Sequence, residues 1–350
     1  MLRESLFPRP VTHGGLSAHL LQSGLAIRAA ALVLLSVLLV LPAAAQKNKK
    51  RTDDDMNTQT LPAFRDPPAA VAAETARLIF NVSPLSNKGL LSQQIRDALK
   101  ALLRDTHGAQ IVKIRAFVAG SGDMRRVPAI VSEVFTERKL ELPAIATVEV
   151  GALPMEGAQV VIESVAVSKR IENPDGLAFY PARPVAELRP IAGALRATCF
   201  LSFLDDLATA KSAAAAAFPG AALNFVQTQR LALERVNVCE AVAKFGGSAD
   251  GAAVVHARKI VMTGLQMAFR TSDADLRLAF ERLGRALDPL GASAKDVFWV
   301  SGYTLTHPVA DKARALQGEF FKGASGTLLL FEGLPSLDAG MAADVIATGN

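Results

Sequence analysis

Three carboxylates occupy matching places in three similar segments of the chain. Glu163 begins "ESVAV", Glu240 lies in "CEAVA" and Asp344 lies in "ADVIA". A carboxylate beside a ligand can bind a polar group or position a water molecule for attack. The structural alternative is that all three are hydrogen-bonded within or at the ends of strands, at the faces between subunits.

A basic pair and a tyrosine add further candidates. Lys113 and Arg115 alternate along "IVKIRAFV", which places both on one face of a strand. They can bind an anion, or they form the solvated side of that strand. Tyr303 can offer its hydroxyl to a ligand, or it lies at an interface with its apolar body covered.

Other chemistries find little support in the sequence. After residue 45 only three histidines remain, with no metal-ligand spacing: His107, His256 and His307. There is no Gly-x-Ser-x-Gly motif, and the glycines of "GSGDMRR" and "GGSADG" lack the arrangement of a phosphate-binding loop. We therefore predict no metal and no cofactor.

The first 45 residues have the features of an export signal. Arg28 precedes the apolar run "AAALVLLSVLLVL", and Ala43–Ala45 offers the small residues that a signal peptidase reads. We expect cleavage after Ala45 and a periplasmic or secreted protein; the alternative is an uncleaved membrane anchor. Without these residues 35 basic and 32 acidic side chains remain, and aromatic residues are scarce, so no nucleic-acid partner is expected.

Export would place Cys199 and Cys239 in an oxidising compartment. Each lies within a predicted strand, in "RATCFLSF" and "VNVCEAVA". A disulfide between neighbouring strands requires the right register. We expect buried free thiols, with a disulfide as the alternative.

A strand pattern recurs three times along the chain. The segments "IVKIRAFVAG", "ALRATCFLSF" and "VFWVSGYTLT" align so that Lys113, Arg196 and Trp299 share one position. Phe117, Phe200 and Tyr303 share another. Each segment leads into a predicted helix (124–135, 207–218, 309–321), a strand (145–150, 222–227, 327–332) and a last strand that carries the carboxylate.

Two of the three units have an additional amphipathic helix. "LLSQQIRDALKALLRD" precedes the first core strand, and "LRLAFERLGRAL", started by Ser272 and Asp275, precedes the third. The middle unit is too short for such a helix. The predicted parts are a signal peptide (1–45), a linker (46–74), a first unit (75–170), a truncated second unit (171–247) and a third unit (248–350).

In their order these segments resemble the Rid (YjgF) family of imine and enamine deaminases. The first unit carries "IVKIRAFV", "LPAIATVEVGALP" and "VVIESVAV"; the third carries "IVMTGLQMAF", "DVFWVSGYTL" and "GTLLLFEGLP". The resemblance implies an α+β fold of chorismate-mutase-like units, each a mixed sheet backed by helices, which assemble as trimers with pockets between subunits. Here two full copies and one truncated copy would form an internal pseudo-trimer, or the chain forms homo-oligomers.

The resemblance also implies a catalytic arginine directly after Pro-Ala and a glutamate on the last strand that positions water. The arginine places hold Ile145, Ala221 or Ala222, and Gly326, and the glutamate places hold Glu163, Glu240 and Asp344. No unit keeps the guanidinium, which binds a carboxylate through two parallel hydrogen bonds. Gly264, in "TGLQMAF", matches a pocket strand, where it admits a ligand close to the backbone or marks a tight strand crossing.

We expect a protein that lacks the usual deaminase chemistry and binds a small carboxylate or carbonyl compound, or a partner, at a cleft between units. The alternative is a 2-iminobutanoate/2-iminopropanoate deaminase that uses a displaced basic residue such as Arg115; a third interpretation is a purely structural protein. No catalytic residue is predicted. The candidate ligand-binding residues are Lys113, Arg115, Glu163, Glu240, Gly264, Tyr303 and Asp344.

Overall fold

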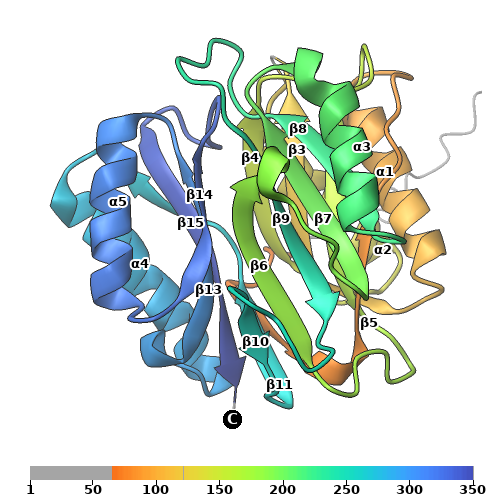
Figure 1. Ribbon diagram of the computed structural model, residues 1–350, viewed down its shortest axis with the longest axis vertical. Helices are drawn as coiled ribbons and strands as arrows, with labels where there is room; N and C mark the ends of the chain where they lie inside the picture. The colour runs from red at the N-terminus through yellow and green to blue at the C-terminus, as the bar shows by residue number, and fades with distance from the viewer. Residues whose placement is uncertain (1–64, 121, 350) are drawn as a thin grey trace, which may run out of the picture. The chain divides into compact units, whose positions relative to one another are not determined.

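The alternating apolar segments form three mixed β-sheets, and helices pack on one face of each sheet (Figure 1). The computed structural model describes residues 65–120 and 122–349, which belong to one unit, Pro62–Asn350. The predicted signal peptide and most of the predicted linker lie outside the described residues. The predicted α+β class, with mixed sheets backed by helices, is confirmed.

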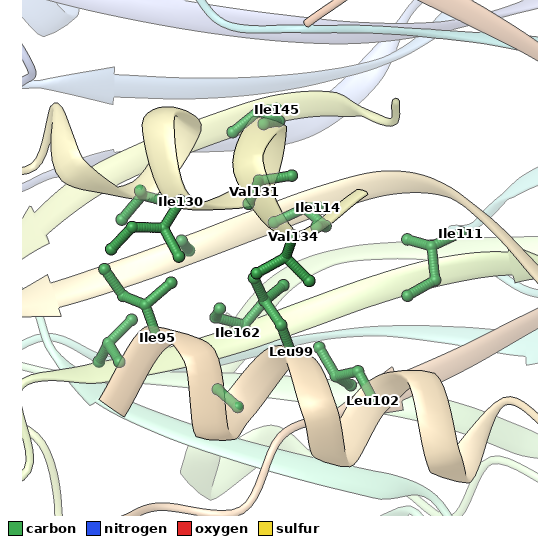
Figure 2. Packing of buried hydrophobic residues seen from close by; sticks show 14 of the residues in the cluster. Ile95, Leu99, Leu102, Ile111, Ile114, Ile130, Val131, Val134, Ile145 and Ile162 are labelled. Carbon is green, nitrogen blue, oxygen red and sulfur yellow. The ribbon is translucent and has the colours of Figure 1, made fainter. Parts of the chain in front are cut away.

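The first sheet has the order β2-β5-β3-β4, with β3 and β4 parallel and the other pairs antiparallel. Its strands are β2 (Leu78–Val82), β3 (Gln110–Ala119), β4 (Ala144–Val150) and β5 (Val160–Val167). Its helices are α1 (Leu91–Asp105) and α2 (Arg126–Glu137), and a 3-10 turn (Thr75–Arg77) precedes β2. Leucine and isoleucine side chains of α1, and Ile130, Val131 and Val134 of α2, pack against the sheet (Figure 2).

The second sheet has the order β10-β6-β9-β7-β8. Its strands are β6 (Leu177–Pro184), β7 (Ala194–Leu201), β8 (Ala222–Gln227), β9 (Asn237–Lys244) and β10 (Ala253–Val255). One α-helix, α3 (Leu207–Ala217), covers it, together with two 3-10 turns (Val185–Glu187 and Leu204–Asp206). Leu188 and Ile191, in the connection after β6, pack on the same core as α3. The sequence predicted that this unit lacks the additional helix of the other two.

The third sheet has the order β1-β11-β15-β13-β14, with β12 paired to β15. Its strands are β1 (Ala70–Glu74), β11 (Lys259–Thr263), β12 (Gln266–Phe269), β13 (Val297–Thr304), β14 (Ser325–Leu330) and β15 (Ala339–Gly349). Two helices cover it, α4 (Asp273–Leu287) and α5 (His307–Phe320), with 3-10 turns at Asp288–Leu290 and Ala294–Asp296. The predicted cap of α4 is confirmed: the Ser272 hydroxyl accepts a hydrogen bond from the Asp275 amide at 3.3 Å.

Two short strands lie differently from the predicted segments. The expected linker ends in β1, which pairs antiparallel with β11 of the third sheet. The segment expected to start the third unit contains β10, which instead pairs with β6 of the second sheet. Both are edge strands whose partners lie far along the chain, so local sequence patterns do not predict them.

The faces that the helices leave uncovered meet one another. At one end, four aromatic side chains from the three sheets form a cluster, with ring centroids 5.2 to 6.4 Å apart: Phe117, Phe200, Tyr303 and Phe331. At the other end, Phe80, Phe179 and Trp299 pack with Met262 in a second apolar cluster. Charged side chains lie on the same strands between these clusters. No helix within the described residues is long and apolar enough to cross a membrane.

Candidate functional site

The strand registers place the three carboxylates at equivalent positions. Glu163 lies opposite Arg115, Glu240 opposite Thr198, and Asp344 opposite Ser301, each on the antiparallel neighbour of a central strand. All six residues line a single cavity between the sheets. The three similar strand segments therefore meet at one site, and the carboxylates do not line three separate pockets.

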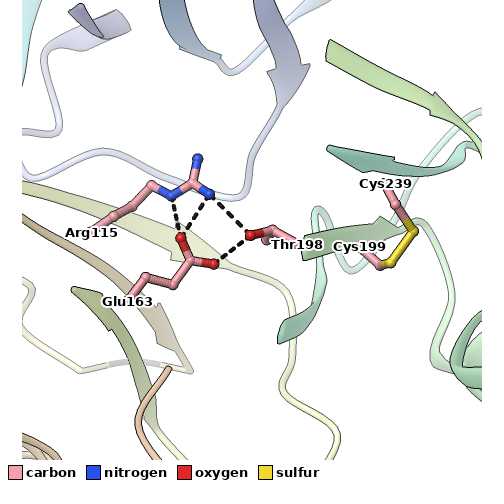
Figure 3. Close-up of a disulfide and its surroundings, with 5 residues drawn as sticks. All are labelled: Arg115, Glu163, Thr198, Cys199 and Cys239. Carbon is pink, nitrogen blue, oxygen red and sulfur yellow. Dashed lines mark hydrogen bonds and ion pairs between the residues drawn. A yellow bond between two sulfur atoms is a disulfide. The ribbon is translucent and has the colours of Figure 1, made fainter. Parts of the chain in front are cut away.

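Glu163 is the most completely satisfied carboxylate of the site. Arg115 Nε donates to its Oε2 at 2.8 Å, and the Thr198 hydroxyl donates to Oε1 at 2.6 Å (Figure 3). The Asn224 amide also donates to Oε1, at 2.7 Å. Burial alone would raise the pKa of Glu163, but Arg115, Arg196 and these hydrogen bonds lower it to about 2. The carboxylate is ionised at neutral pH and has no oxygen left to activate a water molecule.

Arg115 connects the first sheet to the second. Its Nη2 lies 2.7 Å from Glu163 Oε2 and 2.6 Å from Glu240 Oε1. The guanidinium carbon also lies 5.1 Å from the centroid of the Phe117 ring. Burial lowers the pKa of Arg115, but the two carboxylates outweigh burial and raise this pKa well above its ordinary value.

Lys113 connects the first sheet to the third. Its Nζ lies 3.0 Å from Asp344 Oδ1 and also donates to the carbonyl of Thr263. The Tyr303 hydroxyl donates to Asp344 Oδ2 at 3.0 Å, so Tyr303 belongs to this ion pair rather than to an open pocket. Burial lowers the pKa of Lys113, and Asp344 only partly offsets that effect.

The basic pair is buried. Lys113 and Arg115 are 7% and 6% exposed, so the alternative that they form the solvated face of their strand is wrong. The alternation correctly placed Lys113 and Arg115 on one face of β3. That face is not solvated, because the second and third sheets cover it, while helices cover the opposite face.

Arg196 is a member of the site that sequence reasoning did not select. It lines the same cavity, its Nη1 lies 3.5 Å from Glu163 Oε2, and its guanidinium lies 5.5 Å from the centroid of the Phe80 ring. Burial lowers the pKa of Arg196 because this long ion pair compensates it only in part. The signal was present: Arg196 aligns with Lys113 in the strand repeat.

The cavity that these residues surround is small and has two kinds of wall. Its volume is about 40 Å³. The charged side chains form one wall, and the other is apolar and largely aromatic: Phe80, Val165, Phe179, Val242, Ile260, Met262, Trp299 and Ile346. Within residues 65–120 and 122–349, no group of His, Cys, Asp and Glu side chains is arranged to hold a metal ion.

Gly264 lies at a strand crossing and does not line the cavity. Its amide donates to the carbonyl of Ala69 at 2.7 Å, and the next amide, of Leu265, donates to the carbonyl of Ile145 at 2.9 Å. A Cβ on Gly264 would lie 3.2 Å from that Ile145 carbonyl. The close approach that the glycine permits is thus made by the chain's own backbone.

The places of the family's arginine face away from the charged cluster or have no room for a side chain. Ile145 packs in the core between the first sheet and its helices (Figure 2). The registers equate it with Leu223 and Gly326, so the middle place is one residue beyond Ala222. A Cβ on Gly326 would clash with the Val300 carbonyl.

The two cysteines form a disulfide, which corrects the prediction of free thiols (Figure 3). Cys199 on β7 lies directly opposite Cys239 on β9, and their Cα atoms are 4.0 Å apart. The bond lies on the helix side of the second sheet, one residue before Glu240 and one after Thr198.

One protein-family model and several solved structures are similar to parts of this chain. Residues 70–168 match the family model described as Endoribonuclease L-PSP. Among solved structures, the YjgF gene product of E. coli is 28% identical over 30% of this chain and 94% of its own, with a TM-score of 0.23. A YjgF/YER057c/UK114 family member from Mycobacterium tuberculosis is 17% identical over 25% of this chain and 78% of its own (TM-score 0.24).

A chorismatase is 11% identical and covers 81% of this chain and 78% of its own, with a TM-score of 0.41. No curated protein matches the chain. The resemblance to the Rid (YjgF) family that the sequence predicts is confirmed, over residues 70–168.

Proposed function

We propose that this protein is a Rid-like binding protein without deaminase activity, formed by three Rid-like units and exported after cleavage behind Ala45. The observation that carries the proposal is the neutralisation of every carboxylate at the family's water-positioning place. Arg115 pairs with Glu163 and Glu240, and Lys113 pairs with Asp344. Both oxygens of Glu163 and both of Asp344 already have a partner, so these two carboxylates have little capacity to orient an attacking water molecule.

The alternative, a deaminase that uses Arg115 as a displaced cation, is less well supported. A substrate carboxylate would have to replace Glu163 or Glu240 at the guanidinium. The displaced glutamate would remain buried without its partner, which costs about 3–5 kcal/mol. The cleft position beside Ile145 is also filled, because the Leu265 amide bonds to the Ile145 carbonyl.

The ligand site that we favour is the cavity between the three sheets. It combines a few charged groups with apolar walls, as small-molecule sites do. Its lining differs from strand to strand, because equivalent positions hold Lys113, Arg196 and Trp299. Three identical subunits related by symmetry would not supply such an asymmetric lining.

Ammonia release from a freshly generated imino acid tests the proposal. Purified protein of residues 46–350 is added to 2-iminopropanoate formed from alanine by an amino acid oxidase, with an active Rid deaminase run alongside. We expect no rate above the buffer reaction. A rate above buffer that Arg115→Lys abolishes would instead support the displaced-arginine deaminase.

A further inference from the structure

Arg196 differs from the other cations of the central cavity because its side chain donates no hydrogen bond to a residue that the structure describes. Arg115 and Lys113 each donate hydrogen bonds to carboxylate or carbonyl oxygens. Arg196 donates none to the part of the chain that the structure describes, and its one ion pair, with Glu163, is 3.5 Å long. A guanidinium carries five N–H donors, so the cavity is lined by a strong hydrogen-bond donor without an acceptor within residues 65–120 and 122–349.

Glu240 has the complementary feature, a carboxylate oxygen that lacks a hydrogen-bond donor. Its Oε1 accepts from Arg115, while its Oε2 is buried and accepts no hydrogen bond from the described residues. Thr198 lies opposite Glu240 and Arg196 opposite Val242, so Arg196 and Glu240 are diagonal neighbours on the inner face of β7 and β9. A buried carboxylate oxygen without a donor is unfavourable unless a bound molecule satisfies it.

The charge of the cavity constrains the ligand further. Three basic side chains line the cavity, Lys113, Arg115 and Arg196, and three acidic ones, Glu163, Glu240 and Asp344. Their formal charges are therefore balanced. An anion would leave the cluster with an excess negative charge in a low-dielectric environment, whereas a neutral polar molecule keeps the balance.

Size sets the last limit. A volume of about 40 Å³ admits roughly three or four water-sized groups. The wall opposite the charges is formed by Phe80, Phe179 and Trp299, which suits a methyl group or a flat apolar face.

We propose that the central cavity binds a small neutral carboxamide, whose carbonyl accepts from Arg196 and whose N–H donates to Glu240. This inference rests on the proposed function, because it names the ligand class of that same cavity. Acetamide is the simplest probe of suitable size, and acetate is its negatively charged match in shape.

Trp299 gives a direct readout, because it is the only tryptophan in the chain and it lines the cavity. Its fluorescence is titrated with acetamide and with acetate at constant ionic strength. We expect a saturable change with acetamide and at least tenfold weaker binding of acetate. Acetate binding as tightly as acetamide, or no saturable change with either, would overturn the inference.

Variants locate the binding. Arg196→Lys keeps the charge but loses the planar fork, and we expect at least tenfold weaker acetamide binding. Arg183→Lys is the matched control: it changes an arginine of the same sheet that lies outside this cavity and should leave binding unchanged. An unchanged affinity in Arg196→Lys would contradict the assignment.

If Arg196→Lys fails to fold, the acetamide and acetate titrations of the wild type still test the ligand class. Imine turnover in the ammonia assay would refute the proposed function. If Trp299 fluorescence does not respond and no imine turnover occurs, only the ligand class is refuted.

Discussion

At the scale of single residues, the guanidinium of Arg115 joins the first sheet to the second. We predict that Arg115→Met lowers the free energy of unfolding by about 3–5 kcal/mol, because Glu163 and Glu240 would both lose their main buried partner. Urea unfolding followed by circular dichroism measures this.

Arg125→Met is the matched control for that change. Arg125 also pairs with a carboxylate, Asp123 at 2.9 Å, but the pair is exposed, so its loss should matter little. Equal losses in the two variants would show that the buried cluster is not the link between the sheets.

The same cluster predicts a dependence on acid. The pKa of Glu163 is about 2 in the folded protein, below its ordinary value of 4.5, so its ionised form stabilises the fold. That contribution is complete above about pH 4.5 and is lost as the pH falls towards 2, an effect on the order of 3 kcal/mol. Free energies of unfolding at pH 5 and pH 2.5 measure it.

Glu163→Gln cannot titrate at this position and should therefore lose less stability than the wild type between the two pH values. Parallel losses would mean that other carboxylates cause the acid sensitivity.

Most residues of this site could be predicted from the sequence, but the ion pairs between them could not. Glu163, Glu240 and Asp344 were found because they share a place in a repeated strand, and Lys113 and Arg115 because they alternate. Arg196 was overlooked, and the Lys113–Asp344 pair spans 231 positions from 113 to 344. Which charges pair depends on how the sheets pack, and periodicity carries no information about that packing.

At the scale of elements, the helices were the most predictable part. Amphipathic periodicity identified α1 and α4, and Ser272 marked the start of α4. The strands β1 and β10 escaped prediction because each is short and pairs with a strand far along the chain. Their sequences fit an edge strand as well as a linker.

The second sheet shows what replaces a missing helix. Only α3 covers it, aided by the connection through Leu188 and Ile191, and the disulfide joins β7 to β9 beneath that cover. A bond closing a loop of 40 residues removes conformational entropy from the unfolded chain, worth roughly 2–4 kcal/mol.

We therefore predict that dithiothreitol lowers the free energy of unfolding of the wild type by roughly 2–4 kcal/mol. The double variant Cys199→Ala/Cys239→Ala should have the lower stability already and should not respond to the reductant. Full reduction is verified by thiol titration. If the free energy of unfolding of the fully reduced wild type is unchanged, the bond does not stabilise the fold.

At the scale of the whole chain, three sheets surround one charged cluster, and each contributes different side chains to it. Arg115 reaches Glu240 of the second sheet, and Lys113 reaches Asp344 of the third. In an assembly of identical subunits every unit would supply the same residues. Within one chain the equivalent positions can hold different residues, and here they hold charges that neutralise one another.

Sedimentation equilibrium of purified residues 46–350 tests this central claim most directly, because a chain that supplies all three sheets needs no further copies to complete the cluster. We predict a single species with the mass of one chain, which is below the 36.9 kDa of the full sequence because residues 1–45 are missing. A stable trimer, persisting on dilution to nanomolar concentration, would contradict it.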